Sequence, residues 1–172
     1  MKKLLIVLAV VLFSAGFASK VSAQAKLTDN TAGGEILSPI SLVRSTQLQF
    51  GKLAVIAPGG TVVLSPSAPA TLIPSGGVTV VTGVIQTAAS FIVSGATGYG
   101  YAITAPSTIT VVNGAASMVI TPITVKTGAG LGLVGTLTGG TDNFYIGGTL
   151  TVSGTQLVGT YSALFDVTVN YN

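Results

Sequence analysis

Side chains that could carry out catalysis are scarce in this chain. It contains no histidine and no cysteine, so the commonest general base and all thiolate chemistry are missing. The only acidic residues are Asp29, Glu35, Asp142 and Asp166. A glycosidase needs two carboxyl groups beside the bond that it cleaves, and the pair to consider is Asp142 with Asp166. The first lies in the turn-like run TGGTDN and the second on the polar side of an expected strand. Because both have these simpler explanations, we expect no catalytic residues and no enzyme.

Three other patterns suggest ligand binding or nucleophilic catalysis, and each fails a requirement of its chemistry. TGAGLGLVG at 127–135 has the glycine spacing of a dinucleotide-binding loop, but no helical pattern follows it, as that motif requires. TGGTDN offers calcium one carboxylate, Asp142, and the amide of Asn143, which makes a weak site. The pattern G-X-S-X-G is absent, and no histidine exists to activate Ser94 or Ser153. We therefore interpret 127–135 as a hairpin loop and expect neither a cofactor nor a metal.

The elements that would position these side chains are short strands. Val, Ile and Thr dominate the sequence, and β-branched residues favour strands over helices. No segment keeps a helical period of apolar residues for more than about two turns. The expected strands cover residues 36–43, 47–56, 61–65, 78–86, 90–94, 99–104, 107–112, 116–125, 131–138, 144–152 and 157–171.

Turn signals separate these strands. They include Pro58-Gly59-Gly60 and the run from Pro74 to Gly77. Asn113-Gly114, between two alternating runs, predicts a β-hairpin with a type I′ turn. The pattern predicts an all-β protein with an immunoglobulin-like or pilin-like antiparallel β-sandwich, and a jelly roll is the alternative.

The beginning of the chain predicts export. Lys2 and Lys3 precede the apolar run 4–13, and small residues allow cleavage after Ala23 or Ala25. This arrangement is typical of a secretory signal peptide. We expect a signal peptide at 1–25, a flexible N-terminal segment at 26–35 and one β-sandwich domain at 36–172. The expected location is the periplasm, the cell surface or the medium.

Removal of the signal peptide changes the charge of the protein. The full chain has seven Lys and Arg against four Asp and Glu. Cleavage after Ala25 removes three lysines, which leaves four charges of each sign and a net charge of zero. The mature chain therefore lacks the basic surface of a nucleic-acid-binding protein. Beyond the signal peptide, no apolar run reaches the roughly 18 residues of a membrane-spanning helix, so no membrane span is expected.

The last segment, YSALFDVTVNYN at 161–172, alternates regularly. Its odd positions are apolar or aromatic and its even positions, except Leu164, are polar. This period of two predicts a half-buried strand that continues almost to the last residue of the sequence.

Several longer stretches carry a family resemblance. PISLVRSTQLQFGKL, ASFIVSGATGYGYAIT and FYIGGTLTVSGTQLVGTYSALFDVTVNYN resemble a bacterial secreted family known as domain of unknown function 4402. The resemblance covers nearly all of the mature chain. It implies an exported or cell-surface β-sandwich and supplies no enzymatic activity.

The ending is similar to that of chaperone–usher pilus subunits. Those subunits end on an alternating strand with a penultimate tyrosine and a glycine fourteen places from the end, positions that Tyr171 and Gly159 occupy here. The resemblance implies a sandwich that lacks one strand, and a periplasmic chaperone or a second subunit that supplies it by strand addition. The expected assembly residues are Gly159, Tyr161, Ala163, Phe165, Val167, Val169 and Tyr171. Two features depart from the pilin pattern: the usual disulfide is absent, and the segment KLTDNTAGGEIL alternates poorly, so that EILSPISLV is the better donor candidate.

Three readings of function follow. The first is a non-enzymatic, exported, pilin-like structural or adhesion subunit that assembles through its C-terminal strand. In the second, the sandwich is already complete and works as a free-standing surface module. The third is a carbohydrate-binding module that stacks a sugar on Tyr99 and Tyr101. The expected core residues are Phe50, Val80, Phe91, Ile103, Ile120, Phe144, Leu150, Phe165 and Val167.

Overall fold

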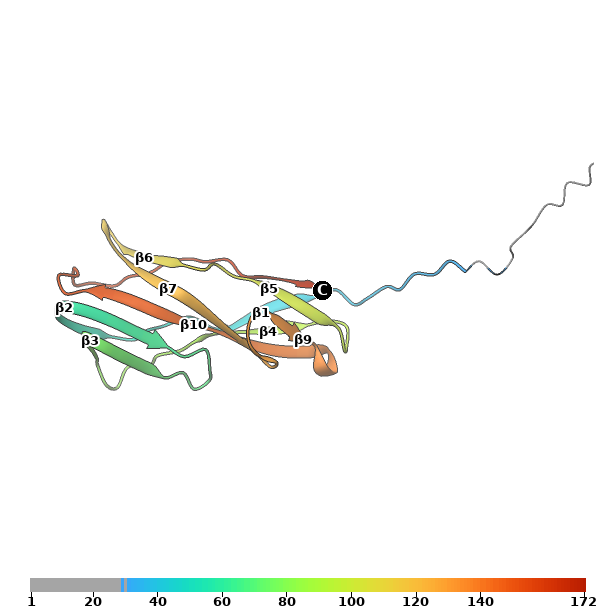
Figure 1. The fold of residues 1–172 in the computed structure, drawn as a ribbon, viewed down its shortest axis with the longest axis horizontal. Helices are drawn as coiled ribbons and strands as arrows, with labels where there is room; N and C mark the ends of the chain where they lie inside the picture. The colour runs from blue at the N-terminus through green and yellow to red at the C-terminus, as the bar shows by residue number, and fades with distance from the viewer. Residues whose placement is uncertain (1–28, 30) are drawn as a thin grey trace, which may run out of the picture. The chain divides into compact units, whose positions relative to one another are not determined.

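The computed structural model describes Asp29 and residues 31–172. The expected signal peptide and both of its cleavage positions lie outside the described residues. The chain divides into a unit that ends at Glu35 and a unit of residues 36–172, and the account below concerns the second unit (Figure 1).

The larger sheet is built around β10 (Thr141–Ser153). One edge of β10 pairs first with β4 (Ala89–Ser94) and then with β2 (Leu53–Leu64), and its other edge pairs with β7 (Ala116–Thr127). The strands at the margins are β1 (Ser41–Thr46) beside β4, β3 (Leu72–Val80) beside β2, and β6 (Ile109–Asn113) and β8 (Gly130–Leu131) beside β7. All of these pairs are antiparallel.

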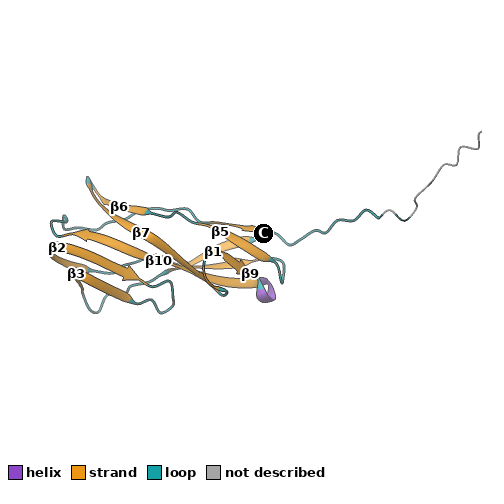
Figure 2. Ribbon diagram, in the orientation of Figure 1, coloured by secondary structure: helices purple, strands orange, loops and turns teal. Residues whose placement is uncertain are grey.

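The smaller sheet has the order β11–β5–β9. It contains β11 (Thr168–Tyr171), β5 (Gly100–Thr104) and β9 (Val134–Thr136). Side chains of β5 pack with those of β4 and β10 in one buried cluster that includes Tyr101, Phe91 and Phe144. A second cluster joins β2, β3, β6, β7 and β10 around Val62, Ile120 and Leu150. The expected all-β antiparallel sandwich is therefore confirmed (Figure 2).

Helical structure within the described residues is limited to one 3-10 turn at Thr138–Gly140. That part of the chain contains no helix that is long and apolar enough to cross a membrane.

Two expected turn signals lie inside strands instead. Pro58-Gly59-Gly60 belongs to β2, and Pro74 to Gly77 belongs to β3. Gly60 and Gly76 face each other across the two strands, and a Cβ on Gly60 would collide with the carbonyl oxygen of Ser75. Glycine is thus required here by close backbone approach and not by a turn.

The predicted hairpin joins β6 to β7, but its turn differs from the expectation. Asn113 pairs with Ala116, so that Gly114 and Ala115 form the two-residue loop. Gly114 has φ +59°, and no residue other than glycine has a positive φ among those described. Glycine at the first central position with an ordinary residue at the second is the type II′ pattern, so the expected type I′ turn is wrong.

Several predicted strand boundaries are wrong. The expected strand at 47–56 begins only at Leu53, and the expected strand at 78–86 ends at Val80, because β3 lies earlier, over Leu72–Val80. The expected strand at 36–43 begins only at Ser41, and Pro39 before it has no amide hydrogen for a ladder. The expected strand at 157–171 is a ladder only over Thr168–Tyr171. The expected strand at 131–138 is divided between β8 and β9.

Five of the nine predicted core residues are buried, and four are only half-buried. Phe91, Ile103, Ile120, Phe144 and Leu150 are at most 6% exposed. The half-buried residues are Phe50, Val80, Phe165 and Val167. Phe165 and Val167 belong to the C-terminal segment, which has neighbouring strands along only part of its length.

Candidate functional site

The C-terminal segment changes sheets along its length. Ser162 exchanges two backbone hydrogen bonds with Val112 of β6, of 3.0 and 3.1 Å, in the larger sheet. Thr168 then begins the ladder with β5 in the smaller sheet. The five residues between these two contacts, 163–167, make no backbone hydrogen bond with any described residue. This bare stretch, residues 163–167, is the site that we consider.

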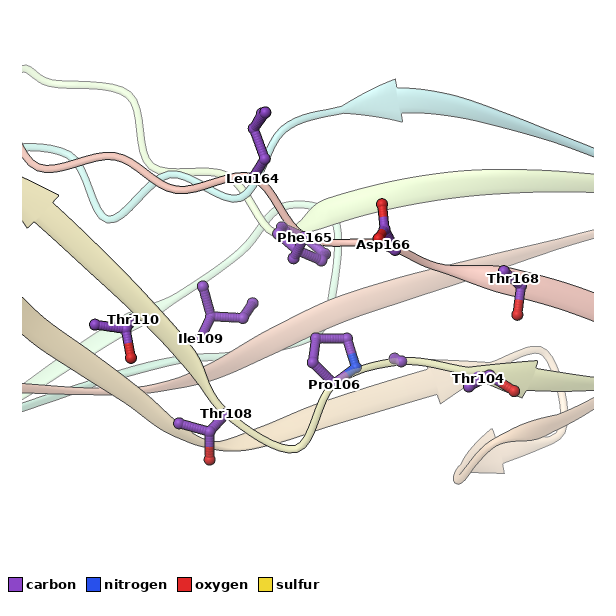
Figure 3. A pocket seen from close by; sticks show the side chains of 10 residues that line it. Thr104, Pro106, Thr108, Ile109, Thr110, Leu164, Phe165, Asp166 and Thr168 are labelled. Carbon is purple, nitrogen blue, oxygen red and sulfur yellow. The ribbon is translucent and has the colours of Figure 1, made fainter.

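The path of residues 105–108 explains why residues 163–167 make no backbone hydrogen bond with a described residue. Residues 105–108 carry the chain from β5 in the smaller sheet to β6 in the larger one, so they cannot follow the C-terminal segment as a ladder. Pro106, in the middle of this crossing, has no amide hydrogen. Residues 104–110 and the C-terminal segment enclose a gap of about 410 Å³, which Ile109, Pro106 and Phe165 help to line. Figure 3 shows these residues around the gap, with Leu164 pointing out of it.

Alternation of the backbone defines two edges of the C-terminal segment. In a strand, the N–H and C=O of successive residues point to opposite edges. The amide groups of Ser162 and Asn172 bond Val112 and Gly100, so even-numbered residues face β5 and β6. The odd-numbered residues from 163 to 171 therefore direct their backbone groups to the other edge, which we call the outer edge. No ladder covers the outer edge within the described residues.

Across the outer edge lies β1, which is itself an edge strand. It pairs with β4 on one side, and no described strand forms a ladder with it on the side of β11. The Tyr171 hydroxyl joins the two edges at one end, because it donates to the Ser38 carbonyl at 2.7 Å and accepts from the Ala96 amide at 2.6 Å. Figure 1 shows the C-terminal end beside the start of β1.

Apolar side chains from both edges are only half-buried here. They pack against the buried cluster but remain partly exposed. These residues are Ile40, Leu42, Leu48, Phe165, Val167, Val169 and Tyr171.

The structure places the seven predicted assembly residues along one continuous segment. Phe165, Val167, Val169 and Tyr171 face the core, whereas Ala163 is exposed. Two others have contacts that the sequence did not indicate. The Tyr161 hydroxyl donates to the Leu157 carbonyl at 2.7 Å and accepts from Gln156. A Cβ on Gly159 would collide with the Asn113 side chain, so this glycine allows close packing on the β6–β7 hairpin.

Asp142 and Asp166, the two acidic residues of the sandwich domain, line different clefts. Asp166 lines the gap beside residues 163–167. The described residues contain no group of three or more His, Cys, Asp or Glu that could hold a metal ion.

Core and edge packing, and not a sugar-stacking surface, account for Tyr99 and Tyr101. Tyr101 is fully buried, and its hydroxyl donates to Asp142 Oδ2 at 2.9 Å. Burial, together with this bond and the charge of Asp142, raises the pKa of the Tyr101 phenol well above its usual range. Tyr99 packs edge-on against Tyr171, with ring centroids 6.0 Å apart.

Comparison with known proteins identifies the family of this chain. The fold defines an antiparallel β-sandwich whose last segment is incompletely paired. A family model described as domain of unknown function (DUF4402) matches residues 40–171, and the chain belongs to this family. Neither the curated proteins nor the solved structures gave a match.

Proposed function

We propose that this protein is a non-enzymatic, exported structural or adhesion subunit of the bacterial surface that takes up an additional β-strand along its outer edge. One observation carries the proposal: residues 163–167 make no backbone hydrogen bond with any described residue, and they lie beside half-buried apolar side chains. Backbone groups and apolar surface left open on one edge are the two features that β-strand addition uses.

The occupant of the outer edge is a second copy of the chain or a periplasmic chaperone. An inserted strand would bond the odd-numbered residues of the C-terminal segment and cover Phe165, Val167 and Leu42. A mature surface with no net charge offers little repulsion between copies. In the free-standing alternative, the sandwich is stable without this strand and works alone.

A proline at position 163 tests this edge. Ala163 is exposed, and its amide group bonds nothing among the described residues. Ala163→Pro therefore removes a donor from the outer edge without breaking a bond of the monomer, and an extended Ser162 suits a following proline. We expect the mature chain, residues 26–172, to form species larger than a monomer in size-exclusion chromatography with light scattering. Ala163→Pro should remain monomeric at the same concentration.

Two controls complete the experiment. Ala163→Ser keeps the amide hydrogen and should assemble like the wild type. Circular dichroism of all three proteins verifies that their folds are equal. A wild-type chain that stays monomeric, and is unchanged by a peptide of residues 26–43, contradicts strand addition and favours the free-standing module.

Export is tested separately. The full chain, expressed in a Gram-negative host, should appear outside the inner membrane. Its mature N-terminus, determined by mass spectrometry, should begin after Ala23 or Ala25. Retention of residues 1–25 on the exported protein would contradict the signal-peptide assignment.

A further inference from the structure

A second cleft lies at the end of the larger sheet, formed by three segments that are distant in sequence. Pro66 to Ala68, after β2, form one wall; residues 126–128, at the end of β7, form another; and residues 141–145, at the start of β10, complete it. Its volume is about 500 Å³. We call it the Asp142 cleft.

Charge is concentrated at the Asp142 cleft. Residues 36–172 contain five charged side chains, which are Arg44, Lys52, Lys126, Asp142 and Asp166. Two of these five, Lys126 and Asp142, line this cleft, although they form no ion pair with each other. Both charges therefore remain available to a ligand.

The carboxylate of Asp142 is held in place. Its Oδ2 accepts from the Tyr101 hydroxyl at 2.9 Å, and its Oδ1 accepts from the Asn143 amide at 2.8 Å. Tyr101 is fully buried, so the position of its hydroxyl, one of the two donors, is fixed by the core. Each carboxylate oxygen can accept a second bond. Asp142 thus offers fixed acceptors whose orientation costs a ligand little entropy.

The turn that contains Gly128 lies close to this carboxylate. A Cβ on Gly128 would lie 2.7 Å from Asp142 Oδ1. The Thr127 hydroxyl holds this turn, because it donates to the Val134 carbonyl at 2.9 Å and accepts from the Ala129 amide at 3.2 Å. A larger residue at position 128 would crowd the carboxylate.

Three further polar groups line the cleft without a partner in the described part of the chain. They are the ammonium of Lys126, the side-chain amide of Asn143 and the hydroxyl of Tyr145. Tyr145 lies directly opposite Lys126 in the β10–β7 ladder, so the two side chains are neighbours on one face. The cleft combines fixed acceptors, free donors and one aromatic ring.

We propose that the Asp142 cleft binds a carbohydrate. Adjacent sugar hydroxyls both donate and accept, which matches a cleft lined by Asp142 as acceptor and by Asn143 and Lys126 as donors. The half-buried ring of Tyr145 can pack against the C–H face of a sugar. Calcium is disfavoured, because the cleft supplies one carboxylate and adds a lysine. An anionic ligand would meet the charge of Asp142.

The proposal is tested by nuclear magnetic resonance of the isotope-labelled mature chain. The probes are glucose, galactose, mannose, fucose and N-acetylglucosamine, followed by an array of immobilised oligosaccharides. We expect at least one sugar to shift the amide signals of residues 66–68, 126–128 and 141–145. Asn143→Ala should weaken that binding about tenfold, which is the loss of one hydrogen bond of about 1.4 kcal/mol.

Matched variants separate this site from the outer edge. Asn170→Ala changes an exposed asparagine of β11 and should leave sugar affinity unchanged, as should Ala163→Pro. Gly128→Ala should weaken sugar binding by crowding Asp142. No response to any sugar on either assay overturns the proposal, and so does a response of these residues to calcium chloride or glycine alone.

Discussion

The strand β10 and the C-terminal segment have the same alternation of apolar and polar residues, yet they differ in what covers them. Each contributes one phenylalanine to the same cluster. Phe144 of β10 is fully buried, because β10 has strands on both edges. Phe165 is half-buried, because no described strand pairs with residues 163–167 on either edge. Alternation therefore decides which way a side chain faces, whereas neighbouring strands decide how deeply it is buried.

Truncation of the two phenylalanines should give the largest effect. Phe144→Ala should cost about 3–5 kcal/mol of unfolding free energy, the range for a buried phenylalanine, and it also removes stacking on Phe91, whose ring centroid is 4.9 Å away. Phe165→Ala should cost about 1–3 kcal/mol in the monomer, because less apolar area is buried.

Urea denaturation of both variants, followed by circular dichroism, measures this difference. The mature wild-type chain and the Phe165→Leu variant serve as references. Equal losses for the two alanine variants would mean that Phe165 is covered as completely as Phe144. The comparison between the two strands would then be wrong.

Removal of the Tyr171 hydroxyl should give an intermediate effect. Tyr171→Phe keeps the ring but leaves the Ser38 carbonyl and the Ala96 amide without this partner. We expect a loss of about 1–2 kcal/mol, as for two partly exposed hydrogen bonds. Amide hydrogen exchange should rise first at Ala96 and along β11, and unchanged exchange there would contradict a joining role for Tyr171.

The smallest effect that we predict is on the pH dependence of stability in the alkaline range, and it depends on Tyr101. Burial raises the pKa of its phenol, so the folded state keeps a proton that the unfolded chain loses near pH 10. The resulting stability is fully present below about pH 10 and declines as the pH rises further. Tyr101→Phe should therefore lose stability at neutral pH but decline less steeply above about pH 10.

Denaturation curves for both proteins from about pH 8 to about pH 11.5 test this difference in slope. Tyr161→Phe changes a half-buried tyrosine elsewhere and is the control. A Tyr101→Phe protein that declines in parallel with the wild type would show that the phenol ionises equally in both states.

The sequence predicted which way side chains of a strand face better than it predicted which segments lie beside that strand. The alternation at 161–171 correctly predicted that Phe165 and Val167 face inward, because the period of a strand is local. Their depth of burial could not be predicted, since it depends on how residues 105–108 move from one sheet to the other. Gly60 and Gly76 were misinterpreted as turn residues, because a glycine that allows close approach has the same local signature as one in a turn.

The C-terminal segment and the Asp142 cleft also differ in how far the sequence could predict them. The C-terminal segment is continuous in sequence, so its residues could be proposed from one stretch of alternation. The Asp142 cleft joins residues 66–68, 126–128 and 141–145, and no spacing in the sequence brings these together. The sequence alone indicates an ordinary turn aspartate at position 142. The β10–β7 register places Lys126 opposite Tyr145, and both residues line the same cleft as Asp142.

The bond between Tyr171 and Ser38 also determines how the domain would bear tension. Ser38 precedes β1 and Tyr171 ends β11, yet a single hydrogen bond joins them. A pulling force that enters at one of these residues and leaves at the other would be carried first by this bond, outside the buried clusters. Because β1 and β11 are both edge strands, extension should peel them away one at a time while the ladders of β10 remain intact.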